Sequence, residues 1–212
     1  MSPTALEIKK ELANSVTHFL GVLFGVAAMP ALISYSVIAG DQSVVIGACV
    51  FAFSFLMVFS FSTLYHSISH PTVKLFLRKM DHISIYFLIA GSYTPFILIY
   101  MTNTKGVFLL SMLWGLTLLG IIFKMFFVGK FNIVSTIAYV AMGWVAVIFP
   151  KDLLGPMPHD VFMMVAIGGA SYSIGVVFYL WERLTYHHAI WHLFVLGGSI
   201  SHYMAVLLAV LD

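Results

Sequence analysis

The chain has 212 residues, of which 61% are hydrophobic and 8% are charged, and its formal net charge is +2. A soluble domain carries roughly 25% charged residues, so this chain lacks the polar groups that would cover a globule in water. The small net charge, which is not gathered into a basic run, argues against nucleic-acid binding. Together with a mean hydropathy of +1.03, these properties predict an integral membrane protein.

Seven apolar stretches follow one another along the chain, each close to the length of about 20 residues that a membrane-crossing helix needs. They cover residues 14–38, 43–66, 81–101, 106–128, 133–149, 161–181 and 188–211. The connections between them are short, and the runs are too long and too uniformly apolar for the strands of a β-barrel. We therefore predict an all-α integral membrane protein, a seven-transmembrane helix bundle. It would form one domain over residues 1–212, with a short cytoplasmic segment at 1–13.

Basic residues are distributed unevenly between the two ends of these stretches. If the N-terminus lies inside, the cytoplasmic side holds eight of them: Lys9, Lys10, Lys74, Arg78, Lys79, Lys124, Lys130 and Arg183. The outer side then holds only Lys105 and Lys151. Because lysine and arginine favour the cytoplasmic side, the sequence predicts a cytoplasmic N-terminus and a C-terminus outside.

Polar residues from three of the stretches meet on the cytoplasmic side. Ser62 and His66 end the second stretch, and Asp81 begins the third, where we expect it in the first turn of the helix. His188 and His192 begin the seventh. Polar side chains are costly inside a bilayer, so their convergence at one depth indicates a functional site.

The spacing of these residues suits a metal site. His188 and His192 are four residues apart and share one face of a helix, so both can point at one ion. With His66 they would give three nitrogens and leave a position open, the arrangement of catalytic Zn²⁺ sites. Asp81 would be a fourth ligand, or it would hold the metal-bound water as a general base. Ser62 would hydrogen-bond to that water or to the aspartate.

Simpler interpretations exist for the same residues. An H-x-x-x-H pair occurs by chance in many chains, and histidines at a membrane boundary can titrate without binding a metal. The convergence in depth favours the metal site. His202 lies about 15 Å deeper than His192 by helical rise, so we expect it to be a buried hydrogen-bonding residue or to line an inner cavity. His18 lies at the cytoplasmic end of the first stretch, where it would support the site or line a path for lipid; we favour a packing residue with its hydrogen bonds satisfied. The small-residue runs at 168–170 and 197–199 predict close contacts between helices.

Several motifs, taken in order, resemble the progestin and adipoQ receptor family, specifically its bacterial haemolysin III-like branch. They are "NSVTHFLG" at 14–21, "STLYH" at 62–66, "KMDHISIYFLIAGSYTPF" at 79–96, "AMGW" at 141–144 and "HHAIWHLFVLGGSISH" at 187–202. The resemblance covers nearly the whole chain. Each motif is modest, but their order on seven apolar stretches is specific.

The resemblance implies a zinc ion near the cytoplasmic face, held by the residues that match His66, His188 and His192. It implies that Asp81 reaches the zinc through water and that Ser62 lies beside it. The family's receptors are similar to alkaline ceramidases, which implies hydrolysis of lipid amides. Bacterial members look like regulators of membrane lipid composition, which implies a multi-pass protein of the bacterial inner (cytoplasmic) membrane.

Three hypotheses for the function follow. The first is a zinc-dependent hydrolase of a lipid amide or ester that contributes to membrane lipid homeostasis. Its fatty-acyl substrate would enter from the bilayer into a cavity lined with Phe and Met. The second is a non-enzymatic lipid sensor or membrane regulator with a structural zinc. The third is a pore-forming haemolysin, which the scarcity of polar residues in the outer halves of the stretches disfavours.

Overall fold

The protein is a bundle of helices in a computed structural model that describes residues 4–212, and over this range it contains no β-strand. The helices are α1 (Ala5–Ala39), α2 (Gln42–Ser67), α3 (Pro71–Tyr100), α4 (Thr104–Phe127), α5 (Asn132–Gly143), the 3₁₀-helix η1 (Val145–Ile148), the π-helix η2 (Pro150–Leu154), α6 (His159–Leu180) and α7 (His187–Leu211). Residues 1–3 of the predicted N-terminal segment lie outside the described residues.

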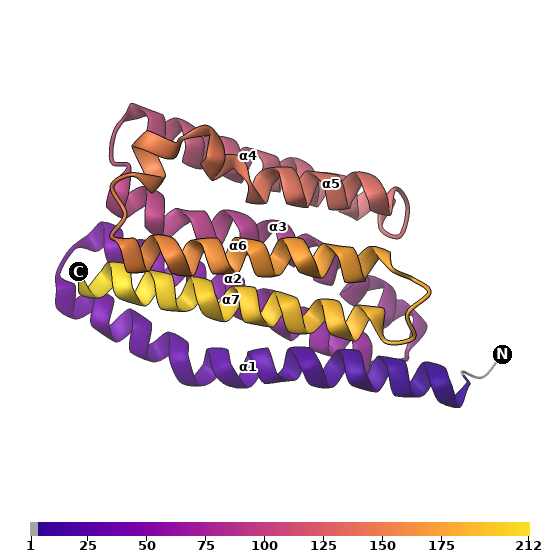
Figure 1. Cartoon of the computed structure of the whole chain (residues 1–212). Coiled ribbons are helices and arrows are strands. Elements are labelled where there is room, and N and C mark those ends of the chain that lie inside the picture. Colours follow the sequence, from indigo (N-terminus) through magenta and orange to yellow (C-terminus); the bar gives the residue numbers. More distant parts are fainter. Residues whose placement is uncertain (1–3) are drawn as a thin grey trace.

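The helices run lengthwise along the molecule, with the N-terminus and the C-terminus at opposite ends (Figure 1). Helix α1 packs against α2 and α7, α2 packs against α3, and α6 packs against α7. Within residues 4–212, six helices are long and apolar enough to cross a membrane: α1, α2, α3, α4, α6 and α7. Large apolar side chains such as Phe126 remain exposed on the outside of the bundle, where lipid would cover them. These features confirm an integral membrane helical bundle.

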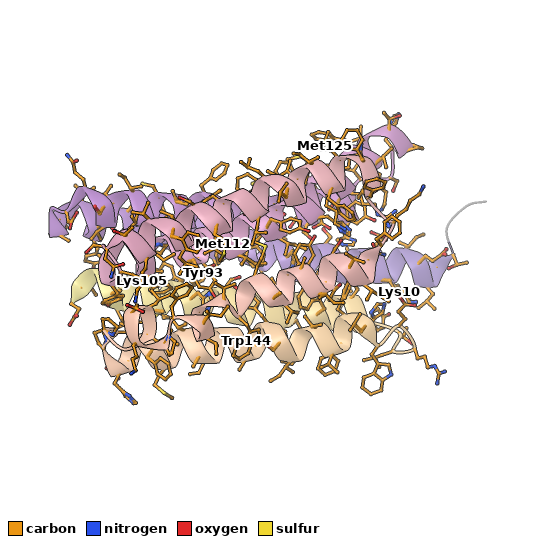
Figure 2. The ribbon with its side chains drawn as sticks, turned by 90° about the horizontal axis from the view of Figure 1, so that it is seen from above. Lys10, Tyr93, Lys105, Met112, Met125 and Trp144 are labelled. Atoms are coloured by element: carbon orange, nitrogen blue, oxygen red, sulfur yellow. The ribbon has the colours of Figure 1, made fainter. Side chains whose placement is uncertain are left out.

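The fifth predicted stretch is not one regular helix. Helix α5 ends at Gly143 after 12 residues, and the chain continues through η1 and η2. Tyr93 of α3 satisfies the backbone at this break, because its hydroxyl donates to the Gly143 carbonyl at 2.6 Å and accepts from the Ala146 N–H at 3.0 Å. Figure 2 shows Tyr93 in the middle part of the bundle. A side chain from another helix thus makes irregular backbone tolerable where lipid offers no hydrogen bonds.

Two helices begin earlier than the apolar pattern predicted. Helix α1 starts at Ala5, where the Thr4 side chain and Glu7 form a reciprocal capping box. Helix α3 starts at Pro71, so most of the connection predicted between residues 66 and 81 is helical. Asp81 lies about three turns into the helix, not in its first turn. Apolarity marks the part of a helix that lipid surrounds. A helix can extend into water beyond that part, as its caps allow.

The predicted close contacts between α6 and α7 are confirmed for one glycine of each run. A Cβ on Gly168 would overlap the His202 ring, and a Cβ on Gly198 would lie 2.8 Å from the Tyr172 ring. Gly169 has open space beside it, and Gly197 faces only the Ser171 hydroxyl. Glycine at 168 and 198 therefore lets the histidine-bearing helix α7 lie directly on α6.

Candidate metal centre

Three histidines from two helices converge near the N-terminal end of the bundle. His66 lies in the last turn of α2, and His188 and His192 lie in the first turns of α7. One ring nitrogen from each lies within 4.8 Å of the others. The ring centroids are 5.3 Å apart for both pairs that include His66, and 4.5 Å apart for His188 and His192. This cluster can hold a metal ion, as the spacing of the histidines predicted.

Helix α1 binds the outer nitrogens of two of these rings. His66 Nδ1 lies 2.8 Å from Glu11 Oε2, and His192 Nδ1 lies 3.1 Å from the Asn14 carbonyl oxygen. Both oxygens are acceptors here, so each Nδ1 carries the hydrogen and each Nε2 is left with its lone pair free. Ligating histidines are commonly oriented in this way, by a carboxylate or a carbonyl on the second nitrogen.

The unshared nitrogen of His66 supports a ligand role. Its Nε2 atom is buried and has no hydrogen-bond partner among residues 4–212. A buried polar atom without a partner is destabilising by about 1–3 kcal/mol, so such atoms are rare in native proteins. A metal ion bound by His66, His188 and His192 would satisfy this atom, and three neutral imidazoles fit such an ion.

Asp81 and Ser62 adjoin the histidine cluster without belonging to it. Asp81 is not in the set of ligand atoms that lie within 4.8 Å of one another, but its carboxylate interacts electrostatically with His66 and lies beside Ser62. The Ser62 hydroxyl is fully buried and makes no hydrogen bond of good geometry in the described part of the chain. Both side chains therefore lie beside the candidate metal centre and outside its set of possible ligands.

His18 lies directly beside the cluster. Its ring stacks on His192 with 3.5 Å between centroids and meets Phe59 edge to face. It is a packing residue as expected, but neither of its buried ring nitrogens has a hydrogen-bond partner among the residues that the structure describes. His202 lies against Tyr172 and lines the inner cavity, one of the two roles expected for it.

Glu11 and Asn14 are site residues that the sequence analysis missed. The signal was available, because residues 11, 14 and 18 are polar and fall on one face of a helix at the start of the first apolar stretch. Glu11 also lies 3.3 Å from Lys74 Nζ, so a cation from α3 helps to hold its carboxylate beside His66. Glu11 lies before the first apolar stretch, so the apolar pattern did not predict that it would be part of the same helix.

A cavity of about 370 Å³ extends from the histidine cluster into the bundle, lined mainly by α3, α5, α6 and α7. His18, Asp81, His188 and His192 line one part of it, and His202 lines a part about 15 Å further along α7. Most of its other walls are aliphatic or tyrosine side chains. Phenylalanine and methionine contribute only Phe96, Phe162 and Met157, fewer than expected.

A second hollow, of about 380 Å³, lies on the other side of the cluster. It is lined by charged and polar groups that include Glu7, Lys10, Glu11 and Arg78. Asp81, His82 and His188 line both hollows. We call the first the inner cavity and the second the vestibule. The candidate metal centre therefore lies where an apolar space meets a polar one.

Comparison with known proteins agrees with the motifs quoted above. The family described as haemolysin-III related matches residues 6–203. Hemolysin-3 of Bacillus cereus is 43% identical over 204 residues, which cover 96% of this chain and 93% of that protein. The Hemolysin-3 homolog of Bacillus subtilis is 43% identical over 200 residues, which cover 94% of each chain.

A more distant relative is found among human proteins. The monocyte to macrophage differentiation factor of Homo sapiens is 27% identical over 214 aligned positions, which cover 96% of this chain and 84% of that protein. The matches extend over nearly the full length of every protein compared, so they include both histidine-bearing helices, α2 and α7. The chain therefore belongs to the haemolysin III-related family, the bacterial branch of the progestin and adipoQ receptor family.

Proposed function

We propose that this chain is a zinc-dependent membrane hydrolase that acts on a lipid amide or ester. The observation that supports it best is the position of the histidine cluster, with His188 and Asp81 lining both the apolar inner cavity and the polar vestibule. Hydrolysis of a lipid needs an acyl chain and water at one place. The inner cavity offers room for the chain, and the vestibule offers a path for water and for the released polar product.

Zinc is the metal that fits this donor set best. His66, His188 and His192 would hold it through three nitrogens and leave one position for substrate or water, with Asp81 close by to act directly or through water. When bound, the ion would lower the pKa of a water toward about 7 and polarise a substrate carbonyl. Glu11 and the Asn14 carbonyl would keep the two buried imidazoles oriented.

The chain's own residues would carry the proton and orient the reactants. The Asp81 carboxylate would accept a proton from water as its oxygen bonds to the carbonyl carbon. The same proton would then go to the leaving nitrogen or oxygen as its bond to that carbon breaks. The products are a fatty acid, which then releases its proton to water, and an amine or alcohol. The Ser62 hydroxyl, which is buried without a partner within residues 4–212, would orient the water or donate to the developing oxyanion.

The same proposal includes seven crossings of the membrane. Helix α5 and the 3₁₀-helix η1 together rise about 26 Å, close to the roughly 30 Å of a bilayer's apolar core. Lys10 and Lys105 lie toward opposite ends of the bundle (Figure 2). The excess of basic residues at the Lys10 end supports a cytoplasmic N-terminus and an outer C-terminus. We place the protein in the cytoplasmic membrane of a bacterium, with a role in membrane lipid homeostasis.

A structural zinc in a non-enzymatic lipid sensor is the second candidate. It is favoured because the cluster joins α2 and α7, and hydrogen bonds from α1 reach histidines on both of these helices. A pore is less well supported. Two relatives carry the name Hemolysin-3, but the inner cavity is largely apolar, and an aqueous pore would need a polar lining.

The experiment that tests the proposal combines metal content with lipid turnover. Elemental mass spectrometry on the purified wild type should find about one zinc per chain, and a His188→Ala, His192→Ala double variant should lose it. Hydrolysis of acyl amides and esters is then followed by mass spectrometry in wild type, in Asp81→Asn and in Asp160→Asn. Asp160 is the matched control because it is an exposed carboxylate at the start of α6.

We expect Asp81→Asn to keep its zinc and lose turnover by at least about a hundredfold, and Asp160→Asn to keep both. Full turnover in Asp81→Asn would contradict the role of Asp81 as base. Zinc without turnover of any lipid in wild type would favour the structural role. A well-folded wild type without metal, even after zinc is supplied, would exclude both zinc proposals.

A further inference from the structure

A buried lysine in the wall of the inner cavity is not explained by the proposed mechanism. The buried residues of α4 follow a single stripe of helical spacing: Gly106, Leu109, Leu113, Thr117, Gly120 and Lys124. Lys124 continues the stripe that packs toward α3, and its exposed fraction is 0%. It therefore faces the interior of the bundle and does not extend outward to lipid head groups, as a lysine near a helix end usually would.

The charge of Lys124 has no counter-ion in the structure. Its Nζ atom is buried without a hydrogen-bond partner, and none of the three ion pairs found within residues 4–212 includes it. An isolated ammonium group is strongly destabilising in an apolar surrounding. Ionisable groups that face the inside of a membrane bundle commonly mark the binding site of a substrate or an ion.

A second cation lies near the end of α4 that carries Lys124. The Arg78 guanidinium of α3 lies against Gly129, in the turn between α4 and α5, and both cations act electrostatically on His82. Arg78 also takes part in none of the ion pairs among the described residues. Lys124 lines the inner cavity and Arg78 lines the vestibule, while His82 and Asn132 line both hollows. The Asp81 carboxylate acts on Arg78, but Lys124 has no ion-pair partner among the described residues. Because two like charges repel, an anion bound where the two hollows meet would stabilise both cations.

We infer that the inner cavity binds an acyl lipid whose head group carries an oxyanion, a carboxylate or a phosphate, held by Lys124 with Arg78. The inference rests on the proposed function, because it names the class of lipid that the same site would take. The acyl chain would lie among the aliphatic walls toward His202. The amide or ester would lie at the histidine cluster, and the anionic group would extend past Asp81 and His82 to the two cations.

A pair of matched acyl amides tests this inference by binding. N-Oleoylglycine ends in a carboxylate, and N-oleoylethanolamine has the same chain and amide but ends in a neutral hydroxyl. Affinities of both are measured on the purified protein in detergent, by the quenching of tryptophan fluorescence. The variants are Lys124→Met and, as a control, Lys130→Met, which removes an exposed lysine from the same end of the bundle.

We expect wild type and Lys130→Met to bind the anionic amide at least about tenfold more tightly than the neutral one, since hydrogen bonds between charged groups are the strong ones. Lys124→Met should lose most of this preference and keep its affinity for the neutral amide. Equal affinities in wild type, or a preference that survives in Lys124→Met, would overturn the inference. Arg78→Gln should reduce the preference in part.

The metal site could also attract a carboxylate, so the His188→Ala, His192→Ala variant is tested in parallel. The preference for the anionic amide should persist in this double variant. If the double variant loses the preference and Lys124→Met keeps it, the carboxylate binds at the metal site and the inference is overturned. Phosphorylated N-oleoylethanolamine separates the two oxyanions, and the tighter of the two ligands identifies the head group. Binding is measured apart from turnover. A preference for the anionic amide without hydrolysis of any lipid would reject the proposed hydrolase activity and leave the anion-binding site supported.

Discussion

At the scale of single residues, the contacts behind the metal ligands matter as much as the ligands. Glu11 bonds to His66 Nδ1 at 2.8 Å and is itself held by Lys74, although its side chain is 40% exposed. A carboxylate on the second nitrogen fixes the tautomer and raises the basicity of the nitrogen that faces the metal. A metal ion would then meet the histidine in an orientation that is already set.

Glu11→Gln should therefore weaken metal binding without removing it. The amide can still accept from His66 Nδ1, but it lacks the charge that makes the imidazole more basic. We expect zinc affinity to fall by roughly 10-fold to 100-fold, measured by competition with a chelator. Glu7→Gln is the control, because glutamine still supports the capping box at the start of α1. Equal zinc affinities in the two variants would contradict a role for Glu11 at the metal centre.

The histidines of the candidate metal centre were predictable, and the residues that support them were not. His188 and His192 share a helix face by their spacing alone, and orientation brought His66 to the same end. The Asn14 contact uses a backbone carbonyl, which every residue has, so no side-chain pattern predicts it. The stacking of His18 on His192 depends on how α1 lies against α7, which no local pattern records.

At the scale of helices, apolar length identified the spans but not their ends or their regularity. Six predicted spans are long helices, because about 20 apolar residues can cross a bilayer in few other ways. The N-terminal ends of α1 and α3 lie beyond the apolar part, where the Thr4 cap and Pro71 at the first helical position favour the start of a helix. The break after α5 depends on a hydroxyl from another helix, so a pattern within 133–149 could not reveal it.

Tyr93→Phe should destabilise the protein through the break that follows α5. The substitution keeps the ring but leaves the Gly143 carbonyl and the Ala146 N–H without their partner. We expect the free energy of unfolding to fall by about 1–3 kcal/mol, with a lower Tm in detergent. Tyr35→Phe is the control, since Tyr35 is exposed and makes no side-chain hydrogen bond in the described range. Equal Tm values for both variants would mean that η1 does not depend on Tyr93.

At the scale of the whole molecule, the site is a product of the arrangement of the bundle. The inner cavity takes its walls from helices distant in sequence, and the vestibule adds α1 and the turn before α7. A sequence shows which residues are polar but not which spaces remain between helices. The roles of the two hollows and of the exposed face of α4 can be interpreted only when the orientation of the bundle in the membrane is known.

That orientation is testable with single cysteines, because Cys49 is the chain's one cysteine and can be replaced by alanine. Lys105→Cys, Lys130→Cys and Lys151→Cys then report on three connections. If α5 crosses the membrane and the N-terminus is cytoplasmic, a membrane-impermeant maleimide will label positions 105 and 151 in intact cells. Position 130 will be labelled only after lysis. Labelling of 130 together with 151 in intact cells would show that α5 does not cross. Labelling of 130 alone would show that the orientation is opposite to the proposed one, with the candidate metal centre and the vestibule on the outer side.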